Sequence, residues 1–252
     1  MASSILPTKV IAGVTVVDTP LVRAAQEYAR AHGDDMTFNH VMRSWLFGVI
    51  IYHKLRAKDA FPSVDLEVHA LSAILHDLGW DTTGELISND KRFEVDGAIA
   101  AKNWIKERQE NGMAKDWDEH KLQLVWDAIA LHTTPSIAAY KQAEVSLCGL
   151  GIVTDFQGPY SDPTQMTTWD EFNAVKAEFP RLDLAGGIRK MMCGFCKTKP
   201  QTTYGSNLFA VLLEDLANLG ADTFMMAFGR KHVEGYKTDG NLSIDIMDNC
   251  IE

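Results

Sequence analysis

The chain has 252 residues, of which 46% are hydrophobic and 23% charged, and its formal net charge at pH 7 is -10. This length and apolar content can form one good-sized hydrophobic core, so we expect a single domain over residues 1–252. The acidic balance argues against a nucleic-acid-binding surface, which needs clustered Lys and Arg to neutralise phosphates.

The sequence also predicts where the protein works. No stretch approaches eighteen uninterrupted apolar residues, so we expect no membrane span. Four cysteines, without a leader that joins a basic start to an apolar core, predict a reducing, cytoplasmic location. Cys193 and Cys196 have the spacing of a redox dithiol, but they fall within an expected helix, so we interpret them as packing residues.

The first 17 residues are rich in Val, Ile and Thr and contain Pro7, which predicts an extended lead-in. From Asp18, the expected cap of the first helix, the signals are helical almost throughout. The expected helices cover residues 19–32, 39–58, 65–77, 90–109, 116–132, 144–156, 168–179, 184–196 and 207–219.

The boundaries of these helices rest on capping and breaking residues. Capping-box patterns pair Asp116 with Glu119 and Thr168 with Glu171, and Pro135 breaks the helix that reaches residue 132. Alternating strands and Asn-Gly hairpin turns are missing from the sequence. We therefore predict an all-α fold, with C-terminal helices within residues 168–220 and a polar tail over 237–252.

The most informative stretch is residues 73–79, where His76 and Asp77 follow an apolar helical run. An imidazole and a carboxylate that are buried without partners would cost several kcal/mol. Sharing a divalent cation removes that cost for both groups. The pair therefore predicts a metal site at the end of this helix.

Two further positions carry ligand types on helices that are otherwise apolar on one face, His40 and Asp155. The ordered set of His, His-Asp and Asp resembles the HD-domain superfamily of metal-dependent helical hydrolases over residues 39–155. The resemblance implies a helical bundle with a central metal site. In it, His40, His76, Asp77 and Asp155 would ligate one divalent metal and leave one or two positions for water.

The flanking residues 38–44, 92–98, 126–137 and 199–204 look like the fungal and yeast cyanamide hydratases of this superfamily. That resemblance implies the addition of water to the nitrile of cyanamide, which gives urea, through a metal-activated hydroxide. It also implies zinc, although a His/Asp shell accepts Fe²⁺ or Mn²⁺ as well. The expected partner is a small neutral nitrile-type substrate.

Two-metal HD proteins carry a histidine where this chain has Phe93, which cannot bind a metal. We therefore expect a mononuclear site. His132, near the position of another ligand to the second ion, is left with two roles: proton transfer or hydrogen bonding in the active site, or a fifth contact to the single metal. Asn39 is a candidate for orienting the substrate or shaping the loop, and Thr134 for offering a hydroxyl to substrate or capping a helix.

Other polar residues near the motif have structural interpretations. Arg43, one turn after residue 40, is expected to pair with a buried acid such as Glu94 or Asp96 in preference to touching substrate. His69, seven residues before His76, is expected on a helix surface, and a position that supports the metal ligands is the alternative. A homo-oligomer would be possible through exposed apolar residues. The candidates for that contact are Met191, Met192, Phe224, Met225, Met226 and Phe228.

Two other functions stay open at this point. A phosphohydrolase acting on nucleotides would need cations near the site, and Arg43, Lys91 and Arg92 are the candidates. A non-catalytic helical module would use the metal for stability alone. An iron oxygenase generally uses two metals, which Phe93 argues against.

Overall fold

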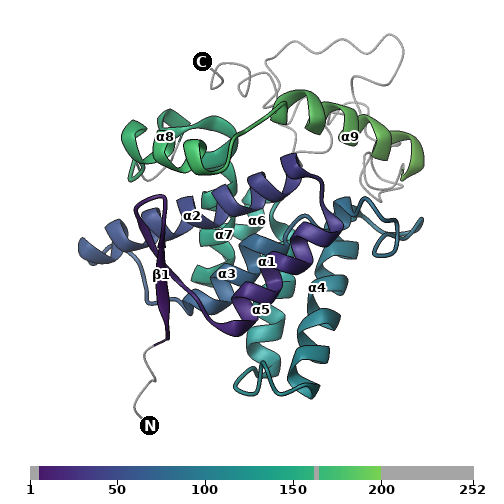
Figure 1. The fold of residues 1–252 in the computed structure, drawn as a ribbon, viewed down its shortest axis with the longest axis horizontal. Helices are drawn as coiled ribbons and strands as arrows, with labels where there is room; N and C mark the ends of the chain where they lie inside the picture. Colours follow the sequence, from purple (N-terminus) through teal and green to yellow (C-terminus); the bar gives the residue numbers. More distant parts are fainter. Residues whose placement is uncertain (1–5, 162–164, 200–252) are drawn as a thin grey trace.

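The computed structural model describes residues 6–161 and 165–199, and helices dominate these residues (Figure 1). The all-α prediction is confirmed. None of the described helices is both long and apolar enough to cross a bilayer. The predicted helix over 207–219, the polar tail and the candidate contact residues 224–228 lie outside the described residues.

The elements follow each other in the order β1 (Thr8–Ile11), β2 (Val14–Val17), α1 (Pro20–His32), α2 (Asp35–Ala57), α3 (Leu66–Leu75), η1 (Leu78–Trp80), α4 (Phe93–Glu110), α5 (Glu119–Leu131), α6 (Pro135–Ala138), α7 (Ala143–Gln157), η2 (Pro159–Ser161), α8 (Trp169–Glu178) and α9 (Leu184–Thr198), where η denotes a short 3₁₀ helix.

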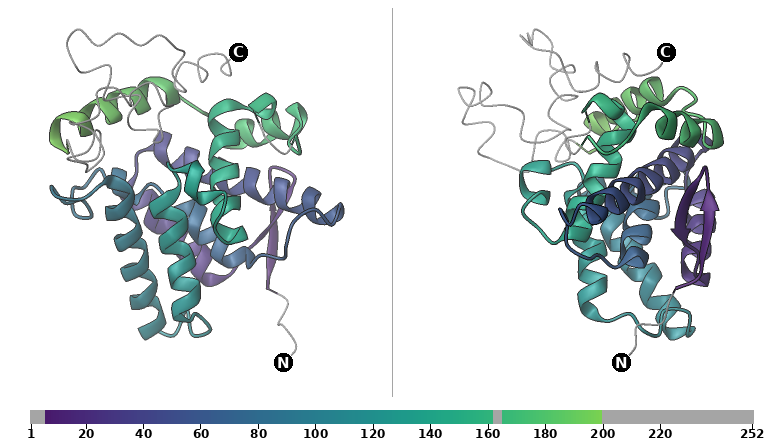
Figure 2. Two further views of the ribbon diagram at one scale, coloured as in Figure 1. Left: turned by 180° about the vertical axis from the view of Figure 1, so that it is seen from behind. Right: turned by 90° about the vertical axis from the view of Figure 1, so that its left-hand side faces the viewer.

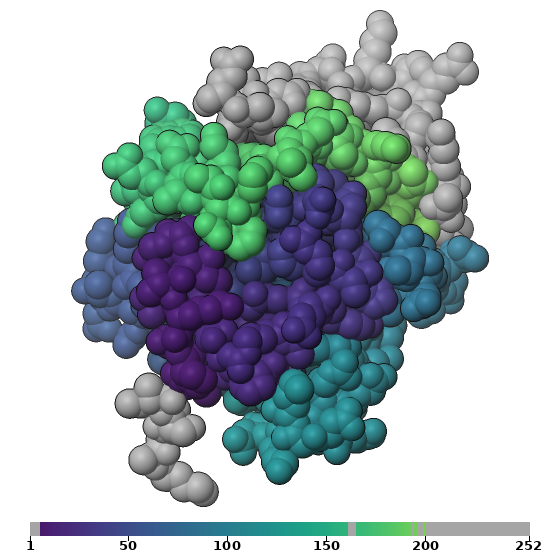
Figure 3. Space-filling view, in the orientation of Figure 1, coloured from purple at the N-terminus to yellow at the C-terminus, as the bar shows by residue number. Residues whose placement is uncertain are grey.

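The long helix α2 lies at the centre, and it packs most extensively against α7 and then α3. Helices α4 and α5 run side by side below it (Figure 2). Helices α8 and α9 lie across the top of the bundle, where their surface adjoins the N-terminal elements in the space-filling view (Figure 3). Two N-terminal strands cover one flank of α2.

Helix α2 is central because every residue from Met36 to Tyr52 is buried. A helix that is buried on all sides has no exposed polar face, and its residues need partners all round. It begins at Asp35, four residues earlier than expected, because the Asp34 carboxylate accepts a hydrogen bond from the Thr37 amide at 2.8 Å.

The predicted extended lead-in forms a hairpin, which the sequence analysis did not anticipate. Strands β1 and β2 pair antiparallel, with Thr8 opposite Val17. The turn uses Ala12 and Gly13, whose φ angles are +49° and +79°, in place of the Asn-Gly pair that usually marks such turns. The inward side chains of β2 join the core, which explains why so short a sheet forms.

Two predicted caps are wrong. Thr19 caps α1 in place of Asp18, whose carboxylate pairs with basic residues on the surface. Helix α5 is capped by Asp118, so the capping box expected from Asp116 and Glu119 does not form. In each case a residue of the same capping class, one or two positions further on, takes the position, a difference that local pattern does not resolve.

Other boundaries agree with the sequence. The predicted capping box of α8 is present, with Thr168 and Glu171 bonded to each other's backbone. Pro135 ends the α5 segment as expected, and it also opens the short helix α6, which was not expected. Cys193 and Cys196 fall inside α9, as the packing interpretation requires.

His69 is fully buried on α3, so the prediction of a surface position is wrong. Its ring lies against α2 at Gly48, where an added Cβ would lie 2.4 Å from the imidazole. The Nε2 atom faces the Trp45 carbonyl oxygen at 3.4 Å. Burial lowers the pKa of His69 to about 4, so the ring is neutral at pH 7.

We predict that Gly151→Ala destabilises the protein by about 1–3 kcal/mol, measured by denaturant unfolding, because α7 and α2 meet too closely for a side chain. A Cβ on Gly151 would lie 2.2 Å from the Ser44 carbonyl oxygen. Gly149 is the matched control on the same helix, since a Cβ there meets nothing within 4 Å. Gly149→Ala is expected to stabilise by up to about 1 kcal/mol, and equal effects of the two substitutions would contradict this account of the contact.

We predict that wild-type stability falls between pH 6.5 and pH 4 by about 3 kcal/mol more than that of His69→Gln. In this range the unfolded chain binds a proton at this residue, whereas the folded protein, with the lowered pKa, does not. Chemical denaturation at several pH values, with both proteins free of metal, checks the difference. Parallel curves for the wild type and His69→Gln would contradict the prediction.

Candidate metal centre

His76 and Asp77 lie in the turn that joins α3 to η1, just beyond the last helical residue. They were expected inside the helix, so the boundary was placed two residues too late. The chain can turn here because η1 contacts the start of α4 without a side chain at Gly79. A Cβ on Gly79 would lie 1.9 Å from the Phe93 carbonyl oxygen. The close approach fixes where the two ligand types point.

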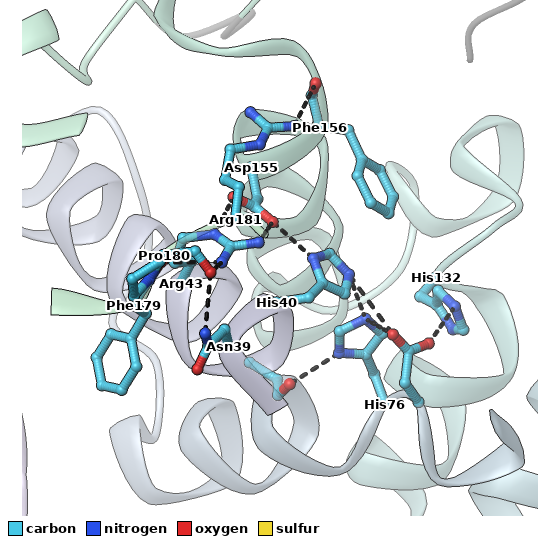
Figure 4. Close-up of polar contacts among 12 residues, drawn as sticks. Asn39, His40, Arg43, His76, His132, Asp155, Phe156, Phe179, Pro180 and Arg181 are labelled. Atoms are coloured by element: carbon cyan, nitrogen blue, oxygen red, sulfur yellow. Dashed lines mark hydrogen bonds and ion pairs between the residues drawn. The ribbon is translucent and has the colours of Figure 1, made fainter. Parts of the chain in front are cut away.

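The structure brings His40 from α2 to the same point (Figure 4). Its Nε2 atom lies 3.2 Å from the Nε2 atom of His76 and 3.5 Å from Oδ2 of Asp77. The His76 Nε2 atom lies 3.1 Å from the same carboxylate oxygen. All three side chains are buried, and together they form a group able to hold a metal ion.

The other nitrogen of each imidazole is engaged. Nδ1 of His40 lies 2.6 Å from Asp155 Oδ2, and Nδ1 of His76 lies 2.8 Å from the Ala73 carbonyl oxygen. These oxygens only accept, so each Nδ1 carries a proton and donates it. This arrangement is the one that orients histidine ligands in metal sites, because it leaves the Nε2 lone pair for the ion.

The donor set fits a divalent cation. Two Nε2 lone pairs at 3.2 Å repel each other unless a proton or a cation lies between them. A proton there could serve Asp77 Oδ2 at best, and it would leave the buried Oδ1 without a hydrogen bond. A cation serves His40, His76 and Asp77 together, with the mixed nitrogen and oxygen ligation of a zinc-type site.

The pKa shifts of His76 and Asp77 indicate that a bound cation must displace a proton. Burial alone would lower the pKa of His76, but the Asp77 carboxylate beside it raises the value overall. Burial acts to raise the pKa of Asp77, yet the neighbouring His76 lowers it. The pair therefore retains a proton more readily when no cation is bound. Metal binding releases that proton, so the metal affinity decreases as the pH falls.

Asp155 lies on the far edge of the His40 ring from His76 and Asp77. Its Oδ2 accepts from His40 Nδ1, while Arg43 donates to both carboxylate oxygens, at 2.6 Å from Nε and 2.9 Å from NH2. These contacts occupy the carboxylate whose ligation of the metal was predicted. Arg43 pairs with a buried acid as expected, but that acid is Asp155 and not Glu94 or Asp96, because α7 packs against this side of α2.

His132 approaches the centre from the end of α5. Its Nδ1 lies 2.6 Å from the Ile129 carbonyl oxygen, so its Nε2 also lacks a proton, and it faces Asp77 Oδ1 at 3.7 Å. Burial lowers the pKa of His132 to about 4, which makes the ring neutral at pH 7. The geometry leaves both predicted roles available, a proton acceptor or a further ligand.

Two predicted contributors have other neighbours. The Asn39 side chain donates to the Pro180 carbonyl oxygen at 2.9 Å, so it holds the segment before α9. Thr134 occupies the N-cap of α6 but makes no capping bond with its side chain. The adjacent Thr133 donates to Glu94, a fully buried carboxylate that the sequence analysis did not assign to the site.

Aromatic rings that the sequence analysis did not assign to the site surround the ligands. Phe156 stacks on the His40 ring at 4.6 Å between centroids, and Trp80 stacks at 6.1 Å. Phe93 meets the His132 ring edge-on at 5.6 Å. Each ring had a signal in the sequence. Phe156 directly follows Asp155, Trp80 comes shortly after Asp77, and Phe93 stands where two-metal HD proteins carry a histidine.

The HD-domain family profile matches residues 37–166, just over half of the chain, and contains His40, His76, Asp77 and Asp155. No curated protein matches the chain. HD domains are typically metal-dependent hydrolases, which agrees with the all-α fold and the buried His-His-Asp group. The chain belongs to the HD-domain family.

Proposed function

We propose that this protein is a cyanamide hydratase-like enzyme that uses one divalent metal to add water to the nitrile of cyanamide, giving urea. The observation that carries the proposal is the wall of the metal centre, where within the described residues aromatic rings pack on His40 and His132 and the nearby Arg43 and Arg92 are engaged by carboxylates. The resemblance of residues 38–44, 92–98 and 126–137 to cyanamide hydratases supports the same reaction. Zinc is the proposed metal, and iron and manganese fit the same ligands.

Phe93 supports a mononuclear centre. The residue is fully buried and packs between His132 and Trp80, where its ring fills space beside the ligands. A second ion at this position would meet hydrocarbon in place of a ligand. A two-metal mechanism, which clamps the attacking and leaving oxygens of a phosphoester, is therefore disfavoured.

The cations that a phosphohydrolase would need are engaged elsewhere. Arg43 is held by Asp155, Arg92 donates to Glu94 at 2.6 Å, and Lys91 pairs with Asp90 at the surface. A phosphate group requires several charge-assisted donors aimed at its oxygens. A small neutral nitrile requires none, so these pairings favour the hydratase over the nucleotide hydrolase.

A cavity of about 840 Å³ lies between the start of α2, η1 and α9. Trp80 forms part of its wall and also stacks on the His40 ring, so the cavity reaches the aromatic layer beside the metal ligands. Met36 and Phe195 line it from either side. We infer that the substrate approaches the centre from this side.

The protein's own residues divide the work as follows. When bound, the divalent cation would lower the pKa of a coordinated water from about 15.7 towards 7. His40, His76 and Asp77 would hold the cation, and Asp155 would fix the His40 ring by accepting from Nδ1. His132, neutral and with a free Nε2 lone pair, would take the proton of the attacking water and deliver it to the nitrile nitrogen. The aromatic wall would exclude bulk water.

We predict that the metal-loaded protein releases urea from cyanamide and that His76→Ala abolishes both the bound metal and this activity. The substitution removes a ligand whose Nε2 lies within 3.2 Å of the other two donors. Elemental analysis and a urea assay measure the two effects on the same preparation. His120→Ala, at an exposed histidine, is the matched control and should change neither.

Phosphate release from a panel of nucleotides, measured in parallel, separates the alternative reaction. Phosphate release without urea would favour the phosphohydrolase. A metal that raises the melting temperature with no turnover of either substrate would favour a structural module. Full activity after chelation would contradict metal dependence altogether.

We predict that His132→Gln lowers kcat by a factor of about 10²–10⁴, the usual contribution of a positioned acid or base, while the metal stays bound. The residue stands outside the group of three metal-competent side chains, and its Nε2 lies 3.7 Å from Asp77. Steady-state kinetics with metal analysis checks both statements. Loss of the metal in His132→Gln would assign the residue as a ligand and contradict its role as the proton carrier.

A further inference from the structure

The connection from α8 to α9 is held by the same residues that hold a metal ligand in place. Arg43 donates through NH1 to the carbonyl oxygens of Phe179 and Pro180, at 3.0 and 3.1 Å. Through Nε and NH2, it donates to Asp155, which in turn accepts from His40 (Figure 4). One fully buried guanidinium therefore bonds both to the connection between α8 and α9 and to the carboxylate that orients His40.

A second contact joins the same two places. Asn39, immediately before His40 on α2, donates to the Pro180 carbonyl oxygen. Because a helix moves its successive residues together, a shift of this part of α2 changes both contacts. The sequence distance is large, about 140 residues between Asn39 and Pro180, so these bonds are tertiary constraints and not local turns.

Helix α9 closes the aromatic side of the centre. Leu184, Ile188 and Met192 pack in one buried cluster with Met36, Trp80 and Phe93. Phe195 stacks on Phe93 at 5.4 Å between ring centroids. Since Trp80 and Phe93 in turn contact the rings of metal-site histidines, the position of α9 determines how firmly this wall is packed.

The far end of α9 is anchored independently. Lys199, just after the helix, forms a buried ion pair with Asp96 at the start of α4. Asp96 also accepts hydrogen bonds from the amide and hydroxyl of Ser88. Removing one partner of such a buried pair is strongly destabilising, so this end stays in place. The end near residues 179–183 is the one whose anchor is shared with the metal centre.

We propose that Arg43 is a positioning residue that couples metal binding at His40 to the docking of the 179–192 segment over the site. A cation held by His40, His76 and Asp77 would restrain the His40 ring, which bonds to Asp155, and Asp155 in turn accepts from the guanidinium that holds the segment. Because such coupling is reciprocal, a docked segment also raises the metal affinity. The inference rests on the metal centre of the proposed function and not on the substrate.

The test compares Arg43→Gln with Lys54→Gln, a matched control on the same helix. Lys54 also ties α2 to the C-terminal part of the bundle, through the Met166 carbonyl oxygen at 2.7 Å and the Glu171 carboxylate at 2.5 Å, and its ammonium group bonds to these oxygens and not to Asp155. In wild type and in Lys54→Gln, saturating Zn²⁺ should slow amide hydrogen exchange in residues 179–192 by at least about fivefold.

In Arg43→Gln, the Zn²⁺ affinity measured by competition with a chelating dye should fall about 10- to 100-fold, the usual effect of losing an outer partner of a metal ligand. At saturating Zn²⁺ the 179–192 segment should show no metal-dependent protection. The visible absorption bands of bound Co²⁺ should shift as well, since the His40 ring is less constrained. Arg43→Lys, which keeps a charge beside Asp155, should restore the affinity in part.

Wild-type metal affinity and wild-type protection in Arg43→Gln would overturn the proposal. Equal losses in Lys54→Gln would also overturn it, because they would show a general loosening of the bundle. None of these measurements uses a nitrile. Intact coupling in a protein that releases no urea would therefore contradict the proposed reaction alone.

Discussion

The interaction on which the centre depends is between a buried carboxylate that receives no hydrogen bond and two imidazole nitrogens that carry lone pairs. Asp77, His40 and His76 meet in this way at 3.1–3.5 Å, inside a core where each unpaired polar atom costs several kcal/mol. Without a cation, one shared proton compensates only in part. The arrangement is stable when a divalent ion takes the place of that proton, so folding and metal binding favour each other.

The rest of the fold keeps these three groups together. Helix α2 carries His40 through the middle of the bundle, and α7 approaches it closely because Gly151 has no side chain. That approach brings Asp155 to the back of the His40 ring, and Arg43 neutralises the carboxylate from the next turn of α2. The cost of burying Asp155 is offset within the same two helices, by the Arg43 guanidinium and the Nδ1–H group of His40.

Much of the centre could be predicted from the sequence, because His76 and Asp77 follow an apolar helix and have no other reason to be buried. His40 could be predicted for the same reason, and a helical fold follows from the periodicity and the capping residues. The partner of Arg43 could not be predicted, since it depends on which helix crosses α2 at that turn. The burial of His69 depends likewise on Gly48, whose missing side chain admits the ring. The hairpin was missed because Ala12 stands where the usual turn signal has Asn.

The aromatic wall decides which chemistry the centre can support. Phe156, Trp80 and Phe93 provide stacking surface and a single indole N–H, which is buried and unbonded among the described residues. A phosphate group that enters such a site loses its hydration without gaining the donors that would replace it, and the desolvation cost rises with its charge. A linear uncharged nitrile loses little hydration, and its developing negative charge lies beside a cation and a neutral imidazole. The selectivity we propose therefore follows from the aromatic character of the wall within the described residues.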